Sequence, residues 1–324
     1  GGAGGTSVPV AGDTAIFDNA GGTHNGALTL NTNVNVATLT FDTNYTGAIT
    51  QGANTINATT AMSLTGQSLT AGAAITASGA LTIASGKTLD MAGNNLTVTS
   101  TFSNSGTLKL TGGEATVTLT NDTDSGTVEY SGTSGPYTLK NWTYYGLKIN
   151  GAATTFNNPA ALTANGPFEI AAGVFDQGAN KNLTVKGNFT IAATGATFTK
   201  GTGTSVLILD GTPSAGVFTG PATAQNLGAV QIGLSPGTTD LAADFAADSL
   251  TINAGDIFNT KGYEVDIGSG SITIATGSPG GTLDTTDNGG AGYEGDGTII
   301  TDAGNFTIGA GGVFTKCVQA SRRS

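Results

Sequence analysis

The residues best suited to chemistry in this sequence are oxygen donors gathered in two loop-like stretches. The first, DTTDNGGAGYEGDG, offers Asp284, Asp287, Asn288, Glu294 and Asp296. The second, NDTDSG, offers Asn121, Asp122 and Asp124. Because hard oxygen ligands on a loop suit Ca²⁺, both stretches are candidate calcium sites. Neither has the ligand spacing of an EF-hand, so a solvated acidic loop is the alternative interpretation.

The densest aromatic stretch is a second chemical feature. Residues 137–145 read YTLKNWTYY and contain Trp142, the only tryptophan, together with Tyr144 and Tyr145. Exposed aromatic faces can stack on sugar rings, which makes these three residues a candidate carbohydrate site. Alternation along a strand would instead bury some of them and leave the rest as a surface ladder.

The residue types argue against an enzyme. His24 is the only histidine, and no nucleophile motif such as G-x-S-x-G surrounds it. Some β-helix enzymes that cleave acidic polysaccharides need a basic residue near the sugar acid, and the only arginines here, Arg322 and Arg323, lie in the tail. Paired carboxylates for glycoside hydrolysis could exist among the many Asp residues, but their spacing identifies no pair. The sequence therefore predicts a protein without catalytic residues.

The charge distribution excludes two classes of partner. The net charge is −11, and residues 239–302 hold 11 acids against Lys261 alone, which gives −10 for that acidic segment. A chain with so few bases cannot neutralise phosphates, so neither nucleic acid nor anionic lipid is expected to bind. No apolar run approaches the ~18 residues that a membrane span requires, so no membrane insertion is expected.

The composition favours an ordered all-β protein. Its strands and turns must position the candidate calcium ligands and aromatic residues. Charged residues make up only 10%, whereas the chain contains 52 Gly, 57 Thr, 20 Ser and 25 Asn. Disordered chains carry high net charge and few β-branched residues, and this chain is rich in Thr, Val and Ile. With one cysteine, Cys317, the chain cannot form an internal disulfide.

Short apolar strands recur at a spacing of about seven residues. In LTIASGKTLDMAGNNLTV (81–98) three alternating segments are separated by Ser, Gly, Lys or Asn. One apolar residue marks each strand from 49 to 108: Ile49, Ile56, Leu64, Leu69, Ile75, Leu81, Leu89, Leu96, Phe102 and Leu108. A helix would need period 3.6 and few glycines, and a sandwich would need longer strands.

This spacing predicts a parallel β-solenoid with about 20 residues per coil, divided among three short faces. Each strand would pair with the coils above and below, about 4.8 Å away. Gly and Asn would occupy the corners, where the backbone needs positive φ. We expect these residues to point inward: Leu96, Phe102, Leu108, Leu183, Phe189, Ile252 and Phe258.

Longer repeats extend the prediction to residues 1–316. An apolar-Thr-apolar strand, a small-residue corner and an inward Phe recur, and the Phe residues expected inside are Phe102, Phe175, Phe198, Phe258 and Phe314. The stretch LAADFAADSL (241–250) has apolar residues at helical spacing, but it runs directly into SLTI and is predicted to be strand and corner. The basic tail 317–324, CVQASRRS, breaks the pattern and is predicted to lie outside the solenoid.

A succession of motifs resembles the repeats of large bacterial cell-surface proteins. They are GTVEYSG (126–132), YYGLKING (144–151), ALTANGPFEI (161–170) and NLTVKGNFTI (182–191). Filamentous-haemagglutinin-like adhesins and autotransporter passenger domains have repeats of this kind. The resemblance implies a secreted, right-handed β-helix at the cell surface that serves in adhesion, surface coating or fibre formation. It supplies no catalytic residues.

These observations lead to one functional prediction and two alternatives. The prediction is a non-enzymatic extracellular protein that is a structural or adhesive segment of a surface fibre or layer. The alternatives are a carbohydrate-binding surface module and a polysaccharide-degrading β-helix enzyme. No cofactor is expected to be required, and Ca²⁺ is the one candidate.

The expected partners are a second copy and a glycan or other cell-surface ligand. A solenoid ends in unpaired strand edges that must be capped or will associate. Neither residues 1–17 nor the coil NFTIGAGGVFTK (305–316) contains a capping helix or a charged strand. We therefore expect head-to-tail association into a fibre. The alternative is that the chain is cut from a longer polypeptide whose other coils supply the caps.

Overall fold

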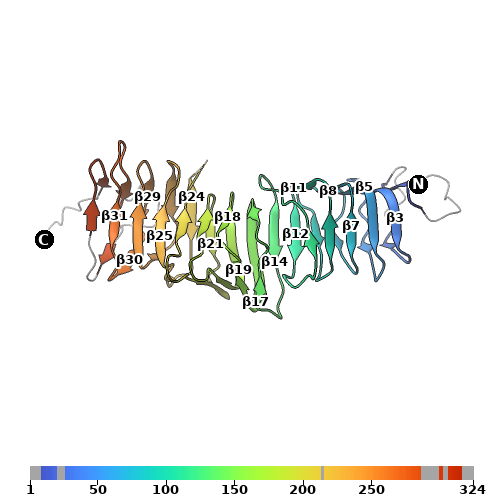
Figure 1. The fold of residues 1–324 in the computed structure, drawn as a ribbon, viewed down its shortest axis with the longest axis horizontal. Helices are drawn as coiled ribbons and strands as arrows, with labels where there is room; N and C mark the ends of the chain where they lie inside the picture. The colour runs from blue at the N-terminus through green and yellow to red at the C-terminus, as the bar shows by residue number, and fades with distance from the viewer. Residues whose placement is uncertain (1–8, 20–25, 213–214, 286–298, 302–305, 316–324) are drawn as a thin grey trace, which may run out of the picture. The chain divides into compact units, whose positions relative to one another are not determined.

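The structure is a computed structural model that describes residues 9–19, 26–212, 215–285, 299–301 and 306–315 (Figure 1). The described residues form β-strands and no helix, so no helix there could cross a membrane. The contacts divide the chain into two compact units. The first comprises Gly1–Tyr137 with Tyr144–Lys148, and the second comprises Thr138–Thr143 with Ile149–Ser324. The chain passes from one unit to the other within three strands, β15 (Tyr137–Thr138), β16 (Thr143–Tyr144) and β17 (Gly146–Asn157).

The first unit contains strands of three sheets. One sheet contains β1 (Thr14–Phe17), β3 (Val34–Phe41), β5 (Ile56–Leu64), β7 (Ile75–Ala77), β8 (Ala80–Ile83), β10 (Leu96–Val98), β11 (Phe102–Asn104) and β13 (Val117–Thr118). A second sheet contains β2 (Leu28–Thr29) and β4 (Ile49–Thr50). The third contributes β6 (Leu69–Thr70), β9 (Thr88–Asp90), β12 (Thr107–Leu110) and β14 (Thr127–Tyr130).

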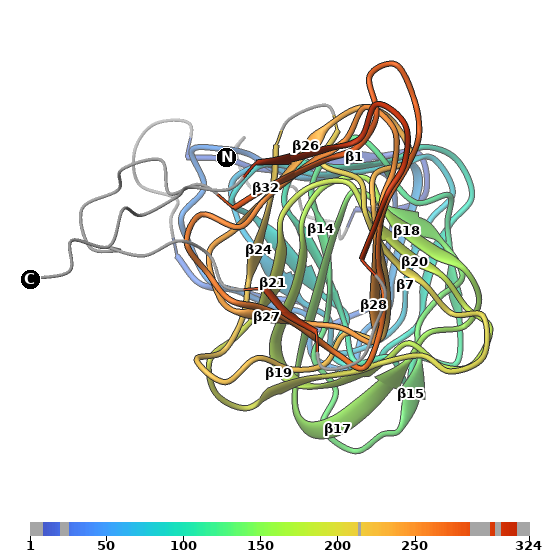
Figure 2. The ribbon, with the colours of Figure 1, turned by 90° about the vertical axis from the view of Figure 1, so that its left-hand side faces the viewer.

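The second unit has three sheets, which surround a common interior in Figure 2. One contains β19 (Phe168–Asp176), β21 (Phe189–Ile191), β22 (Ala196–Thr199), β24 (Gly216–Thr219), β26 (Thr238–Leu241), β29 (Ile257–Asn259), β32 (Thr282–Asp284) and β35 (Val313–Thr315). Another contains β18 (Leu162–Ala164), β20 (Leu183–Val185), β23 (Leu207–Leu209), β25 (Ala229–Ile232), β28 (Ser249–Ile252), β31 (Ile272–Ile274) and β34 (Phe306–Ile308). The third contains β27 (Phe245–Ala246), β30 (Val265–Gly268) and β33 (Ile299–Thr301).

The strand register confirms the predicted parallel β-solenoid. Leu96 pairs in parallel with Ile75 on one side and Val117 on the other, so equivalent positions are 21 residues apart in each direction. In the second unit Leu183 lies between Leu162 and Leu207 in the same way. About 21 residues make one turn, close to the predicted 20. The stretch LAADFAADSL is strand and corner, as predicted.

The interior consists of ladders of like side chains. All seven residues expected to point inward are buried, and Leu96, Leu108 and Phe258 are completely inaccessible. In the second unit the rings of Phe168 and Phe189 stack with centroids 5.4 Å apart. Phe314 is in register with the buried Leu283, as an inward position requires, but it is 38% exposed because no described strand covers the far side of β35.

Asparagine side chains and small residues join the corners of successive coils. The Asn33 Oδ1 accepts a hydrogen bond from the Thr55 amide at 3.0 Å, and Asn182 Oδ1 accepts one from the Val206 amide at 3.0 Å. At Gly79 any Cβ would overlap the carbonyl oxygen of Thr60 in the preceding coil, so only glycine fits there. The abundance of Asn and Gly therefore follows from corners that must pair at close range.

Candidate functional site

The aromatic stretch does not form a platform of three exposed rings. The Tyr144 side chain is buried, and its hydroxyl lies 3.0 Å from the Tyr130 hydroxyl, also within the first unit. Burial raises the pKa of Tyr144 well above its ordinary value. Tyr145 is 36% exposed, and Trp142, in the second unit, is half-buried. Of the three predicted sugar-binding residues, only Tyr145 and Trp142 keep accessible rings.

The loop at 121–125 is a turn held together by its own side chains. Asp122 accepts hydrogen bonds from the Asn104 amide at 2.8 Å, the Asp124 amide at 3.1 Å and the Ser125 hydroxyl at 3.2 Å. Desolvation alone would raise the pKa of Asp122, but these hydrogen bonds outweigh it and lower that pKa. A hydrogen bond to Asp122 raises the pKa of the exposed Asp124. Hydrogen bonds within the turn therefore already occupy the Asp122 carboxylate. The neighbouring residue Asn121 is half-buried.

The longer acidic loop lies mostly outside the described residues. Asp284 is the half-buried last residue of β32. Asp287, Asn288, Glu294 and Asp296, like His24 and Cys317, fall outside the described ranges. Within those ranges no group of three or more His, Cys, Asp or Glu side chains is placed to hold a metal ion. Calcium binding at both loops stays a prediction.

Two buried carboxylates in the second unit come closest to an acid–base pair. Burial raises the pKa of Asp256 to about 6, and the neighbouring negative charge of Asp210 adds to the effect. Asp210 accepts hydrogen bonds from the Leu234 amide at 2.6 Å and the Ser235 amide at 3.0 Å, and Asp256 accepts one from the Gly237 amide at 2.9 Å.

The turn at 233–237 closes over this pair. Asp210 and Asp256 are 3% and 1% exposed, so a substrate cannot reach either group. A Cβ at Gly233, whose φ is +81°, would overlap the Asp256 carboxylate. The pair therefore holds a turn in place, and its raised pKa comes from burial rather than from a role in catalysis.

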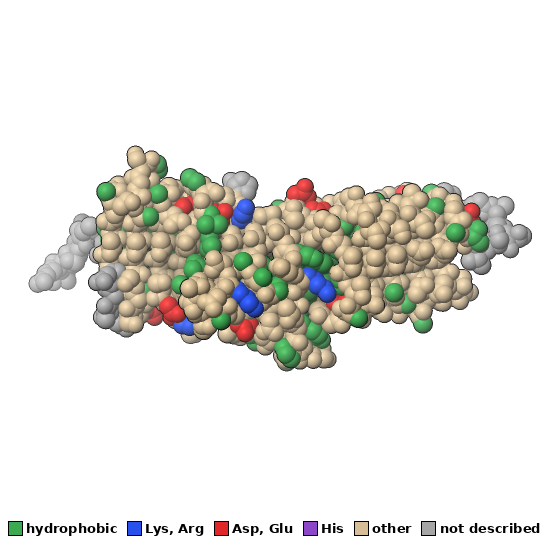
Figure 3. Space-filling model, in the orientation of Figure 1, with side chains coloured by type: hydrophobic (Ala, Val, Ile, Leu, Met, Phe, Trp, Pro, Cys, Tyr) green, Lys and Arg blue, Asp and Glu red, His purple; other side chains and the backbone are tan. Residues whose placement is uncertain are grey.

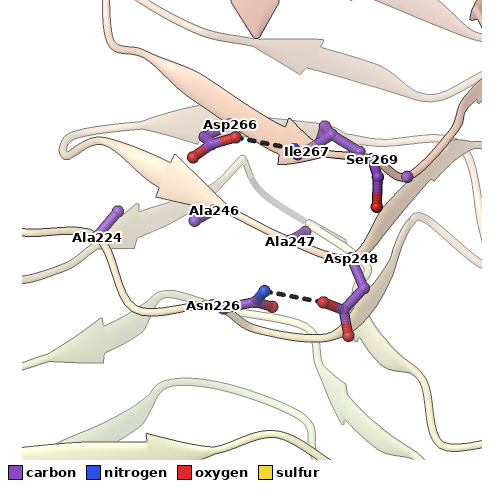
Figure 4. A pocket seen from close by; sticks show the side chains of 10 residues that line it. Ala224, Asn226, Ala246, Ala247, Asp248, Asp266, Ile267 and Ser269 are labelled. Atoms are coloured by element: carbon purple, nitrogen blue, oxygen red, sulfur yellow. Dashed lines mark hydrogen bonds between the residues drawn. The ribbon is translucent and has the colours of Figure 1, made fainter. Parts of the chain in front are cut away.

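A groove of about 560 Å³ opens on the second unit, where three successive coils carry small side chains (Figure 4). Its lining comes from residues 224–226, from the end of β27 and the corner after it, and from β30 and the corner that follows. These residues are Ala224, Asn226, Ala246, Ala247, Asp248, Asp266, Ile267, Gly268, Ser269 and Gly270. The groove exists because Ala and Gly stand where larger residues would fill the space.

Polar groups stand along the sides of this groove. Asp248 accepts a hydrogen bond from the side-chain Nδ2 of Asn226 at 2.8 Å and forms an ion pair with Lys200 at 2.6 Å. Desolvation works to raise the pKa of Asp248, but the hydrogen bonds from Lys200 and Asn226 lower it overall. Asp266 accepts a hydrogen bond from the Gly268 amide at 2.8 Å.

Sequence reasoning did not find this groove, although a signal was present. The Ala-rich run AADFAADS and the GSG at 268–270 place small residues where other coils carry Thr or larger side chains. Recognising the hollow requires knowing that these runs stack on one another. That in turn depends on the register of β27 against β30, in which Ala246 pairs with Asp266.

The last described coil of the second unit presents apolar side chains to solvent. Phe306, Ile308, Val313 and Phe314 are between 38% and 47% exposed. Their register partners one coil earlier, such as Ile272, Ile274 and Leu283, are fully buried. The Phe306 and Phe314 rings pack edge to face with centroids 5.4 Å apart.

The first described coil of the first unit contains an apolar hollow of about 150 Å³. Inward-facing side chains of β1, β2 and β3 line it, including Phe17, Leu28 and Leu39. Among the described strands, β1 pairs only with β3, and β2 pairs only with β4. Each unit thus has one coil with an apolar interior that no described strand covers.

No protein family, curated protein or solved structure matches the chain.

Proposed function

We propose that this protein is a non-enzymatic structural segment of an extracellular surface fibre or layer, and that copies associate head to tail. The observation that carries the proposal is the exposed apolar coil formed by β34 and β35. It has the side-chain pattern of a buried coil, with Phe306 and Ile308 at positions that are inaccessible one coil earlier. Burying such side chains contributes about 1.5–3 kcal/mol each.

The hollow in the first described coil gives that apolar coil a complementary surface. Phe17, Leu28 and Leu39 present an apolar concavity, and two of the strands that line it, β1 and β2, each pair with only one described strand. A parallel strand added at such an edge satisfies backbone groups and extends the side-chain ladders. A contact between two different ends of one chain does not close on itself, so it propagates into a fibre.

The low charge of the surface supports the same function. The face shown in Figure 3 carries few acidic or basic side chains. Only 10% of all residues are charged, so repulsion between stacked copies comes mainly from the acidic segment 239–302. A surface of Thr, Ser and Asn stays hydrated without charge, which suits a segment whose neighbours are copies of itself.

Sedimentation velocity over a range of protein concentrations tests the proposal. We expect the wild-type sedimentation coefficient to rise with concentration, and the double variant Phe306→Asp with Phe314→Asp to remain monomeric. Thr251→Asp is the matched control, because it adds a carboxylate to a half-buried outward position of β28. A wild-type protein that stays monomeric at high concentration, with and without Ca²⁺, would refute the proposal.

A further inference from the structure

We infer that the groove lined by Asn226, Asp248, Asp266 and Ser269 binds a short, uncharged oligosaccharide. This site is separate from the coil ends on which the proposed fibre contact depends. Its volume of about 560 Å³ falls within the range of roughly 300–1,000 Å³ that is typical of small-ligand sites. In Figure 4 the small side chains Ala246 and Ala247 lie between Asp266 and Ser269 on one side and Asn226 and Asp248 on the other.

The polar groups of the groove are suited to hydroxyl donors. Asp248 has half of its side-chain surface exposed, and Lys200 with Asn226 hold its carboxylate in one orientation. Asp266 offers a second carboxylate from the neighbouring coil, and the exposed Ser269 adds a hydroxyl. Carboxylates accept strong hydrogen bonds from hydroxyl groups. Two carboxylates, an amide and a hydroxyl around one hollow therefore match a ligand with several hydroxyls.

Charge decides between neutral and acidic sugars. The Lys200 ion pair compensates Asp248, whereas Asp266 forms no ion pair within the described part of the chain. The surrounding segment 239–302 carries −10, so a uronic acid or a sulfated sugar would be repelled. The groove contains no aromatic ring, so hydrogen bonds and shape rather than stacking must supply the affinity.

Isothermal titration calorimetry with defined oligosaccharides tests the inference. The probes are cellotetraose, maltotetraose, xylotetraose and N,N′,N″,N‴-tetraacetylchitotetraose, with trigalacturonate as the acidic counterpart and CaCl₂ alone as the metal control. We expect saturable binding of at least one neutral probe and none of trigalacturonate. Asp266→Asn should weaken that binding about tenfold, the loss expected when a charged hydrogen-bond acceptor is removed.

A substitution that fills the groove tests whether the sugar binds there. Ala246→Leu places a larger side chain on the outward face of β27 and should abolish binding. Ala80→Leu makes the same change at a half-buried position of β8 in the first unit and should leave the affinity unchanged. Thermal unfolding midpoints within a few degrees of wild type show that both variants fold.

Three outcomes would overturn the inference. They are no saturable binding of any neutral probe, binding that survives Ala246→Leu, or heat from CaCl₂ alone that Asp266→Asn removes while no sugar binds. The fibre proposal does not share these outcomes, because its test uses substitutions in β34 and β35 only.

Discussion

Asp256 is a buried side chain whose protonation affects stability at mildly acidic pH. Its carboxyl is buried beside Asp210 under the turn at 233–237, and its pKa rises to about 6. In an unfolded chain an Asp has a pKa of about 3.9. Between these two values the folded state binds more protons than the unfolded state. The contribution of Asp256 to the free energy of unfolding therefore falls as pH rises from about 4 to 6 and levels off above that range.

Replacing Asp256 by Asn should remove this dependence. The amide oxygen can still accept the hydrogen bond from the Gly237 amide, while the repulsion with Asp210 disappears. We expect Asp256→Asn to be more stable than wild type at pH 7.5 and to lose that advantage near pH 4. Thermal unfolding across this pH range measures the difference. Asp244→Asn, which changes a half-buried carboxylate outside the pair, should leave the wild-type pH profile intact.

The direction of a single side chain was predictable from the sequence, but contacts between side chains of different coils were not. Leu96 and Phe258 point inward because alternation along a strand fixes direction locally. Asp210 and Asp256 are 46 residues apart, whereas the two coils from Leu207 to Leu250 span 43 residues. The spacing between register partners in successive coils varies from 19 residues between Ile56 and Ile75 to 34 between Ile272 and Phe306. A single spacing therefore cannot place one carboxylate beside another.

Within a single strand, successive residues face opposite sides of the sheet, and β10 is an example. Leu96 is completely buried between Ile75 and Val117, whereas Thr97 is half-buried on the outer side. We expect Leu96→Asp to lower the free energy of unfolding by at least about 3 kcal/mol, because it buries an unpaired charge in the ladder.

The neighbouring substitution is the control for that prediction. Thr97→Asp should change stability by no more than about 0.5 kcal/mol, because the carboxylate reaches water. Urea denaturation of both variants measures the two effects. Equal destabilisation would show that the inward and outward assignment of β10 is incorrect.

The strands themselves were predictable because their local pattern is self-sufficient. The seven-residue spacing, the Thr between two apolar residues and the Gly at corners each specify a short strand and a turn. The exposure of Phe314 was not predictable from its own strand. Its strand has the same pattern as an interior strand, but burial requires a coil on both sides, and the pattern of one strand carries no information about its neighbours.

For the molecule as a whole, the described coils of each unit follow one rule: parallel stacking at about 21 residues per turn. Each coil contacts mainly its neighbours, so stability is a sum of coil and interface contributions. Adding a coil from a second copy is then energetically similar to adding one within the chain. The proposed fibre contact repeats, between chains, the pairing that β31 and β34 already make within one.

Cross-linking between the two ends of different copies tests this central claim most directly. Ile16→Cys and Ile308→Cys change residues that are 57% and 47% exposed, each in a background where Cys317→Ser removes the native thiol. The two proteins, one carrying a mass tag, are mixed and treated with a short bis-maleimide. The head-to-tail account predicts a product that joins one copy of each protein, with little product between like copies. Products between like copies only, or no product at concentrations where the wild type sediments as an assembly, would contradict it.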